Sequence, residues 1–518
     1  MPMQPVPKTL VLDWLWLFAL AIGLPLLATL LLGTDANWDL RNYHLYNPHA
    51  WLTGRDAIDI APAQLQSWHN PLLDVPMYLL VSSGADARWT SLWLTLPSML
   101  SLFLLLRLQT ALSPVRPSRT SQSVLVLLAI TGAAFGSTLG LSMNDAFVGA
   151  AIMGSLVVLV EPREDWVGRH RWLLAGLIAG AITGLKLTAI FYCLGLAVAS
   201  LATGPWPRQL GRMAALGMGG TLGFLLTYGA WGWRMFVVHG NPFFPYYNNL
   251  FQSPDALTWS WTDTRFRTES VFETLASPFE LLTRTRDFSE PTLRDPRLLL
   301  GVAGLAALWL WHRRATVESR GRYRLVLVFF VVSWLLWAMQ YGIYRYAIVL
   351  EMLGCLALVL VLQRLPRARH LALVVALLVV VAGTKRPNWG HVRSTAPVAG
   401  IVAPLLPADS LVVVASQEPL AYLALGLPRD VPMIAVLNNF MAPGRCTGLQ
   451  AQARSRIAAH AGPVWLLAAD AADAGKAQAL AGGYLGLDSG GACREWRSAI
   501  GSALLCPQRQ VRAPEAGC

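Results

Sequence analysis

The stretch 34–48 places a dense set of chemically active side chains directly after the first apolar run of the chain. It holds two carboxylates, Asp35 and Asp39, among Asn, Tyr, His and Trp side chains. A carboxylate held at a membrane surface could take a proton from a substrate hydroxyl. If the part from Asp39 is helical, one face carries Asp39, Asn42, Tyr43 and Tyr46. The alternative is an interfacial helix whose aromatic side chains form a belt at the membrane surface.

Lys186 is the second informative residue. The chain has four Lys against dozens of Arg, yet Lys186 stands between two apolar half-helices. Ionisable groups in or near a membrane are costly and are therefore candidates for function. An ammonium there favours an anionic ligand, whereas the alternative is snorkelling to the interface. By the same reasoning, the outward-facing candidates are Asp35, Asp39, His69, Asp74, Asn144, Asp145, Lys186, Arg345 and Glu351.

Three of these candidates have plain structural alternatives. Asp145 follows Asn144 where one apolar run ends and the next begins, so the pair could cap a helix. Arg345 follows two Tyr residues at the end of a run and could belong to an aromatic belt. His69 precedes Asn-Pro and could be a turn residue.

Composition decides the class of protein. Hydrophobic residues make up 55% and charged residues 14% of the chain, the mean hydropathy is +0.46, and there are 21 Trp. This balance indicates a polytopic membrane protein with aromatic side chains at two water interfaces. The net charge of +12 comes mostly from Arg in short loops between apolar runs, so nucleic acid is excluded as a partner.

The apolar runs predict about eleven membrane spans. The first run is too long for a signal-peptide core, and no small-residue cleavage site follows it, so we expect it to remain as a helix. The predicted spans cover 10–33, 89–111, 122–141, 145–160, 172–184, 187–202, 213–238, 297–311, 325–340, 346–363 and 370–384. Residues 71–83 are apolar but short, which leaves a re-entrant or surface helix and a twelfth span open.

Basic loops set the orientation. Arg residues gather at 116–119, 163–171, 208–212, 313–324 and 364–369, and these five loops fall on one side of the membrane under this count. That side is therefore cytoplasmic, together with the amino terminus. We expect the loops 34–88 and 239–296 and the tail after Lys385 to face outward, from the inner or plasma membrane of a bacterium.

Two of the predicted spans, 172–184 and 187–202, are too short to cross a bilayer singly and meet at Lys186. Such a break implies a protein-lined or wet cavity. The second outward loop begins with the aromatic, Pro-rich stretch 240–249, which could line the entry for a lipid tail or an acceptor or could pack on the membrane.

After Pro407 the pattern changes to short β-rich runs that alternate with Ala-rich helical pieces. The predicted strands are 411–416, 433–437 and 464–468, and the predicted helices lie near 448–460 and 471–482. The domains are thus a transmembrane domain over 1–384 and an outward α/β domain over 385–518. Cys493 and Cys506 flank a predicted hairpin and could pair in an oxidising space.

Outward carboxylates and cations around broken helices suit the transfer of a group from a lipid-borne phosphate. The carboxylate takes the proton of an acceptor hydroxyl, and a cation stabilises the charge on the departing phosphate. One base is sufficient because a phosphate leaves without being protonated, unlike the leaving group of a glycoside hydrolase.

The order of these residues resembles the GT-C class of membrane glycosyltransferases, which use polyprenyl-phosphate-linked sugars. Relatives include the protein O-mannosyltransferases and the aminoarabinose transferase of lipid A. The class carries an Asp and then a Tyr after the first span, a short helix ending in a Gly turn, and a basic residue or His before Pro-Pro-Leu. The matching segments are Asp39 with Tyr43, Trp51-Leu-Thr-Gly54 and His69-Asn-Pro-Leu72, and a second Asp two spans on resembles Asp145. Asn70 replaces the first Pro, and no acidic residue directly follows Asp39.

The resemblance implies inverting transfer of a sugar from a polyprenyl phosphate to an acceptor hydroxyl on a lipid, glycan or protein. No certain cofactor follows, and a divalent cation stays open. The rival interpretation is a transporter or flippase of a lipid-linked saccharide, which should show paired helix breaks in two symmetric halves. The roles expected are Asp39 as general base, Asp145 as a group positioning the acceptor or a metal, Lys186 and Arg345 as phosphate partners, and Tyr43 and His69 as positioning groups.

Overall fold

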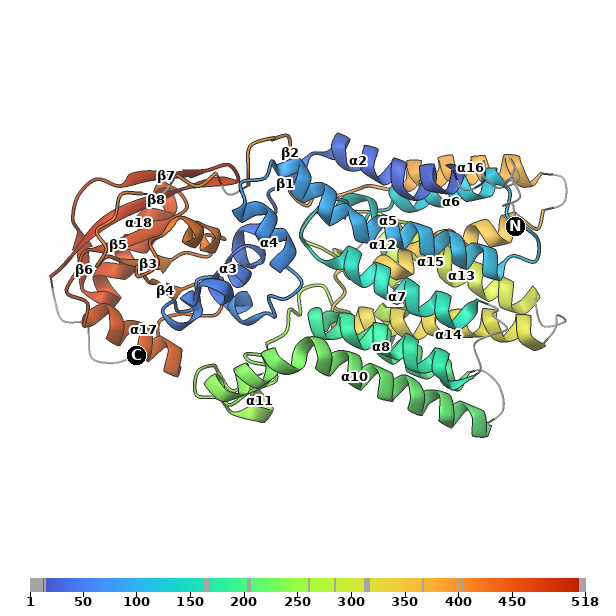
Figure 1. Cartoon of the computed structure of the whole chain (residues 1–518), viewed down its shortest axis with the longest axis horizontal. Coiled ribbons are helices and arrows are strands. Elements are labelled where there is room, and N and C mark those ends of the chain that lie inside the picture. The colour runs from blue at the N-terminus through green and yellow to red at the C-terminus, as the bar shows by residue number, and fades with distance from the viewer. Residues whose placement is uncertain are drawn as a thin grey trace, which may run out of the picture. The chain divides into compact units, whose positions relative to one another are not determined.

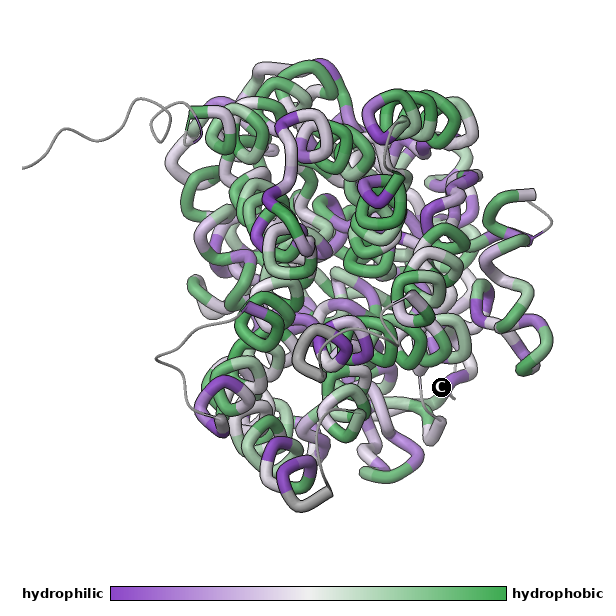
Figure 2. Tube along the Cα trace, turned by 90° about the vertical axis from the view of Figure 1, so that its right-hand side faces the viewer, coloured by the Kyte–Doolittle hydropathy of each residue, from purple (hydrophilic) through white to green (hydrophobic). Residues whose placement is uncertain are grey.

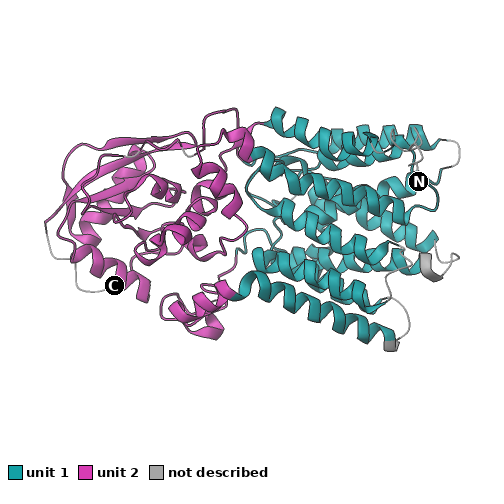
Figure 3. Cartoon of the chain, in the orientation of Figure 1, with its two compact units in different colours: residues 1–32, 91–229, 263–389 teal, residues 33–90, 230–262, 390–518 magenta. Residues whose placement is uncertain are grey.

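Two compact units make up the chain (Figure 3). Unit 1 comprises Met1–Leu32, Ser91–Gly229 and Asp263–Trp389, and unit 2 comprises Gly33–Thr90, Ala230–Thr262 and Gly390–Cys518. The computed structural model describes residues 13, 15–161, 168–202, 206–259, 261–283, 286–311, 317–365, 368–398, 400–402 and 404–511. The predicted cytoplasmic residues Arg163, Arg313, Arg314 and Arg367 lie outside these ranges.

Unit 1 is built from apolar helices (Figure 1), of which α10 continues into unit 2 after Gly229, and Figure 2 shows most of their residues as hydrophobic. Helix α15 is almost wholly buried and packs against α6, α7, α13, α14 and α16. The helices are η1 (Ala19–Gly23), α2 (Leu24–Leu32), α5 (Ala87–Leu112), α6 (Arg119–Ile130), α7 (Asp145–Val160), α8 (Arg169–Leu185), α9 (Ile190–Leu201), α10 (Trp206–His239), α12 (Val271–Thr283), α13 (Arg297–Trp311), α14 (Val317–Gln340), α15 (Ile348–Leu362) and α16 (Arg369–Gly383). Three short 3-10 turns, η5 (Gly136–Thr138), η6 (Leu187–Ala189) and η8 (Tyr344–Ala347), separate some of them.

Five helices of the described chain are long and apolar enough to cross a membrane, which makes this an integral membrane protein. They are Leu15–Leu32, Ala87–Leu112, Arg208–His239, Arg320–Gln340 and Tyr344–Leu362. Further apolar helices of 10 to 17 residues include α6, α7, α13 and α16. The count of eleven spans stays a prediction.

The helix predicted over 122–141 is wrong in its second half, because α6 ends at Ile130. Beyond it, the backbone N–H of Ala133 bonds to Asp295, and those of Ala134 and Phe135 bond to Glu351. An N–H group that donates to a distant carboxylate no longer donates to the carbonyl four residues earlier. Long-range side-chain contacts therefore replace the helix here.

Glycines bring α8 and α10 into backbone contact. A Cβ on Gly180 would stand 2.0 Å from the carbonyl oxygen of Gly220, and one on Gly223 would stand 2.1 Å from that of Leu177. Only glycine permits such an approach, which is a common way for membrane helices to associate. The hydroxyl of Thr227 on α10 also donates to the carbonyl of Ala181 on α8, over 2.8 Å.

Unit 2 contains a six-stranded mixed sheet with the order β4-β3-β5-β8-β6, to which β7 adds by pairing with β8. The strands β3 (Leu411–Ala415), β4 (Met433–Leu437) and β5 (Val464–Ala468) are parallel, as expected for buried, β-branched runs. The sequence predicted these three strands and both helices, α17 (Gly448–Ala458) and α18 (Ala471–Leu480). The remaining elements are β1 (Thr34–Asp35), η2 (Leu40–His44), α3 (Tyr46–Thr53), η3 (Arg55–Ala57), η4 (Gln64–Trp68), α4 (Val75–Ser82), α11 (Asn248–Phe251), β2 (His391–Val392), η9 (Ala421–Gly426), η10 (Ala481–Leu485), β6 (Leu487–Ser489), β7 (Arg494–Ser498) and β8 (Gly501–Gln510).

The first loop adds to the edge of this sheet. Ile60 pairs with Ile434 of β4 in the parallel sense, with its N–H on the carbonyl of Met433 and its carbonyl on the N–H of Ala435. A buried ion pair anchors the addition, since Arg55 bonds Asp59 and also donates to the carbonyl of Val431 over 2.8 Å. The exposed edge that β4 would otherwise present is thereby covered.

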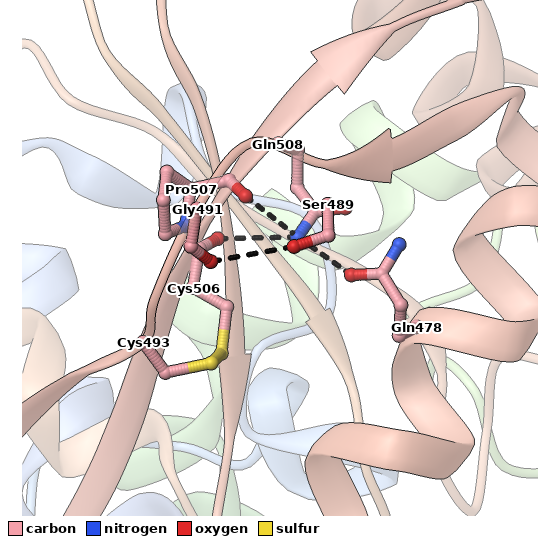
Figure 4. Close-up of a disulfide and its surroundings, with 7 residues drawn as sticks. All are labelled: Gln478, Ser489, Gly491, Cys493, Cys506, Pro507 and Gln508. Carbon is pink, nitrogen blue, oxygen red and sulfur yellow. Dashed lines mark hydrogen bonds between the residues drawn. A yellow bond between two sulfur atoms is a disulfide. The ribbon is translucent and has the colours of Figure 1, made fainter.

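The predicted hairpin near the carboxyl terminus is present, and its cysteines form a disulfide (Figure 4). Cys493 precedes β7, and Cys506 lies on β8 with its backbone paired to Leu466 of β5. This pairing suits an oxidising compartment, as the outward placement expects. Residues 71–83 contain only the eight-residue helix α4, about 12 Å long, which is too short to cross a bilayer.

Candidate functional site: a cation pair on Asp145

The break predicted at Lys186 is confirmed. Helix α8 ends at Leu185, Lys186 has an extended backbone with φ −142° and ψ 98°, and a single 3-10 turn leads into α9. The hydroxyl of Thr227 on α10 packs directly against Gly184, because a Cβ on Gly184 would lie 2.2 Å from it. Close packing of α8 against α10 therefore holds the end of α8 that directly precedes Lys186.

Three predicted site residues from distant parts of the sequence meet in unit 1. The Lys186 Nζ lies 2.5 Å from Oδ1 of Asp145, and the Arg345 Nη1 lies 3.2 Å from Oδ2 of the same carboxylate. All three side chains are largely buried, with exposed fractions of 14%, 3% and 10% for Lys186, Asp145 and Arg345. The Lys186 ammonium also donates to the carbonyl of Met143 over 2.6 Å. We call these residues the Asp145 trio.

Both cations contact the same aromatic ring. The Lys186 Nζ lies 5.2 Å and the Arg345 guanidinium carbon 5.1 Å from the ring centroid of Tyr346. Trp389 lies under the same guanidinium at 5.7 Å. Cation–π contacts of this kind lower the cost of removing a charge from water. The trio carries a formal charge of +1, since two cations share one carboxylate.

A second buried ion network holds the segments that carry the trio. Glu351 on α15 and Asp295 before α13 bind the backbone after α6, and Arg297 bonds Asp295 at 2.8 Å. The three charged side chains are fully buried. Arg297 also donates to the carbonyl of Leu128 at the end of α6. Glu351 follows Arg345 by six residues, and the backbone that it binds precedes Asp145 by about ten. The network therefore joins the segment that carries Arg345 to the segment that leads to Asp145.

The other predicted residues, Asp39, Tyr43 and His69, belong to unit 2. Asp39 stands at the start of the π-helical turn η2 and is 8% exposed. The rings of Tyr43 and His69 meet edge to face at 5.1 Å, and the His69 Nε2 lies 2.8 Å from the hydroxyl of Tyr246. Asp35 has a local role, because its Oδ1 accepts the N–H of Asn37.

Sequence reasoning missed a His–Asp pair in the same unit. The His44 Nδ1 lies 2.9 Å from Asp74 Oδ2, and both residues are buried. Asp74 was a candidate and His44 lies in the polar stretch 34–48, yet a pairing across 30 residues leaves no periodic signal. Tyr346, Asp295 and Arg297 were also missed. Within the described residues, no group of three His, Cys, Asp or Glu side chains is placed to hold a metal ion.

The helices and the mixed sheet define the class as a polytopic membrane protein with an attached α/β element. Among solved structures, the chain is similar to the crystal structure of ArnT from Cupriavidus metallidurans in the apo state. The two share 14% sequence identity over 96% of this chain and 98% of that chain, with a TM-score of 0.45. A likeness at this level does not establish a family or an activity. No family model matches the sequence, and neither does any curated protein.

Proposed function

We propose that this protein is a GT-C type glycosyltransferase that moves a sugar from a polyprenyl-phosphate donor to an acceptor hydroxyl on the outer side of the membrane. The observation that carries the proposal is the Asp145 trio, a buried group of two cations and one carboxylate beside a helix break. A buried cation pair of this kind binds a phosphate through charge-assisted hydrogen bonds.

In the proposed reaction the acceptor oxygen attacks the anomeric carbon of the sugar from the face opposite the phosphate. The new carbon–oxygen bond forms as the bond from that carbon to the phosphate oxygen breaks, which inverts the configuration. The electron pair stays on the phosphate oxygen, and the acceptor proton passes to the carboxylate of Asp39. The base then returns the proton to water.

The cations act where charge builds up. Lys186 and Arg345 stabilise the polyprenyl phosphate as it departs, and preorganised charges in a water-poor site are effective because they need no reorganisation. The contacts support a role for Asp145 in orienting both cations, in addition to the role toward the acceptor or a metal expected from the sequence. Tyr43 and His69 serve as positioning groups.

The proposal is tested with the purified protein in liposomes, a set of polyprenyl-phosphate sugars and candidate acceptor glycolipids. We expect release of free polyprenyl phosphate together with a glycosylated acceptor of inverted anomeric configuration. Asp39→Asn should abolish transfer while the protein stays folded in the membrane. Asp35→Asn is the matched control, because an Asn oxygen can still accept the N–H of Asn37. Full activity of Asp39→Asn refutes the assignment of the base.

A further inference from the structure

The second loop contains an arm, residues 240–259, that exposes large apolar side chains and buries two carboxamide side chains. It follows directly on helix α10, which is long and apolar enough to cross a membrane. Four of its exposed side chains are large and apolar. The exposed fractions are 49% for Tyr247, 70% for Leu250, 37% for Phe251 and 50% for Trp259.

Two carboxamides lie in the interior of the arm, beside apolar side chains such as Phe244. Asn248 is fully buried, and its amide donates to the carbonyls of Ser253, Ala256 and Leu257, while its oxygen accepts the N–H of Ser253. Asn241 is also fully buried and bonds the carbonyl of Tyr246 and the N–H of Phe243. Two carboxamides thus satisfy backbone groups that a loop in water would leave to solvent.

Backbone bonds complete this internal satisfaction. The N–H groups of Tyr246, Leu250 and Gln252 donate to carbonyls three or four residues earlier. The prolines of the arm have no N–H to satisfy. Irregular backbone near lipid requires that its polar groups be paired within the protein, since lipid offers no partners. The arm meets this requirement and presents apolar side chains outward.

The distribution of exposed large hydrophobic side chains within unit 2 supports lipid as the occupant of this surface. Outside the arm and α10, the first loop and the segments next to the sheet also expose such side chains, at Trp51, Leu52, Leu72, Leu79, Val392, Val402, Leu405 and Val511. Residues 406–510, all of them described and including most of the sheet, expose no large hydrophobic side chain. The last turns of α10 and the arm expose eight within 27 residues, among them Trp233, Phe236, Val237 and Val238. The sheet is therefore suited to water and the arm to an apolar phase. Asn249 and Gln252 are exposed on the same turn as Leu250, which favours the headgroup boundary over the acyl centre.

We propose that the arm lies in the outer lipid interface of the membrane, with Tyr247, Leu250, Phe251 and Trp259 against bilayer phospholipid. Its base is fixed by a hydrogen bond between His239 Nδ1 and Asp255 Oδ2 at 2.7 Å and by the N–H of Gly448, which donates to the carbonyl of Pro254. The arm is thus a second membrane attachment of unit 2, distinct from the spanning helices.

The test places the photoreactive residue p-benzoylphenylalanine at Leu250 in the full-length protein, reconstituted in liposomes of phosphatidylethanolamine and phosphatidylglycerol. After irradiation we expect a phospholipid adduct at residue 250, identified by mass spectrometry. The same residue at Arg429, exposed in unit 2, should give none. A second probe at Trp259 guards against a local effect of the Leu250 replacement.

Three outcomes overturn the proposal. They are no lipid adduct at either arm position, an adduct only with a second protein chain, and an adduct that forms only when polyprenyl phosphate is added to the liposomes. The last would make the arm a donor-binding surface. The readout needs no catalytic activity, so it is independent of the proposed glycosyl transfer.

Discussion

At the scale of the residue, the Asp145 carboxylate occupies an unusual position, since each of its oxygens is bonded to a different cation. Removing the Asp145 carboxylate is costly, about 3–5 kcal/mol, because two buried cations are then left uncompensated. A bound phosphate would add a second counter-charge to the trio. Anion binding and the stability of this region should therefore be coupled.

Replacing either cation should weaken donor binding. We expect Lys186→Gln and Arg345→Gln each to raise the KM for the donor about 10- to 100-fold, since a hydrogen bond to a charged group contributes about 1.5–3 kcal/mol. Steady-state kinetics at varied donor concentration measure this. Lys385→Gln is the control, because the Lys385 ammonium bonds Thr292 away from the trio. Equal effects at Lys186 and Lys385 would contradict the assignment.

Two groups of unit 2 have pKa values shifted in opposite directions. Burial raises the pKa of Asp59 to about 6 despite the neighbouring Arg55. Burial, together with the charge of Arg55, lowers the pKa of His49 to about 4. The contribution of Asp59 to stability is therefore fully present below pH 3.8 and lost as pH rises through 6. That of His49 is present above pH 6.5 and lost as pH falls toward 4.

Opposite pH profiles should follow in two variants. Between pH 7 and pH 5 we expect the unfolding free energy of Asp59→Asn to fall by about 1 kcal/mol relative to wild type, because the proton gained by Asp59 is no longer available. That of His49→Gln should rise by about 2 kcal/mol relative to wild type over the same interval. Unfolding in detergent at several pH values measures both. Profiles parallel to wild type would contradict the prediction.

The sequence identified a candidate site residue where its side-chain type was unusual for the surrounding segment. Lys186 was identifiable because an ammonium interrupts an apolar run, and the structure confirms the break there. The contacts within the trio were not predictable, because Asp145 is 41 residues from Lys186 and 200 residues from Arg345. The roles of Asp39, Tyr43 and His69 stay predictions. Tyr346 had no distinguishing signal, since aromatic residues are common at membrane interfaces.

At the scale of the element, apolar length predicted most helices of unit 1, and alternation with β-branched residues predicted the parallel strands. The failure at α6 is informative. Residues 131–141 contain apolar side chains but also three Gly, which favour a helix poorly, and Asp295 and Glu351 bind the backbone N–H groups of residues 133–135. Hydrophobic periodicity depends on the local sequence alone. It therefore cannot show that side chains from distant parts of the chain will bind the backbone N–H groups of the segment.

The contact between α8 and α10 allows a sharp test. Gly180→Leu should destabilise unit 1 by about 3 kcal/mol, because its Cβ would stand 2.0 Å from the backbone of Gly220. Gly217→Leu, on the same helix pair, has nothing within 4 Å of its Cβ and should be nearly neutral. Thermal unfolding in detergent compares the two. Similar melting temperatures would show that the helices do not pack closely.

At the scale of the whole molecule, the Arg-rich loops predict that the residues of unit 2 face outward. We expect a membrane-impermeant maleimide to label Arg429→Cys in intact cells. Arg116→Cys, in a predicted cytoplasmic loop, should be labelled only after the membrane is permeabilised. Mass spectrometry of the purified variants measures the labelling. The reverse pattern would invert the topology and exclude Asp39 from an outward reaction.

The addition of Ile60 to β4 has a consequence for biosynthesis. Asp59 and its partner Met433 are 374 residues apart, so ribosomes working at about 5–20 residues per second complete the second about 20–75 s after the first. During that interval the first loop lacks the strand that it will join. The backbone groups of Ile60 must meanwhile bond to water or to another partner, because unpaired N–H and C=O groups are costly to bury.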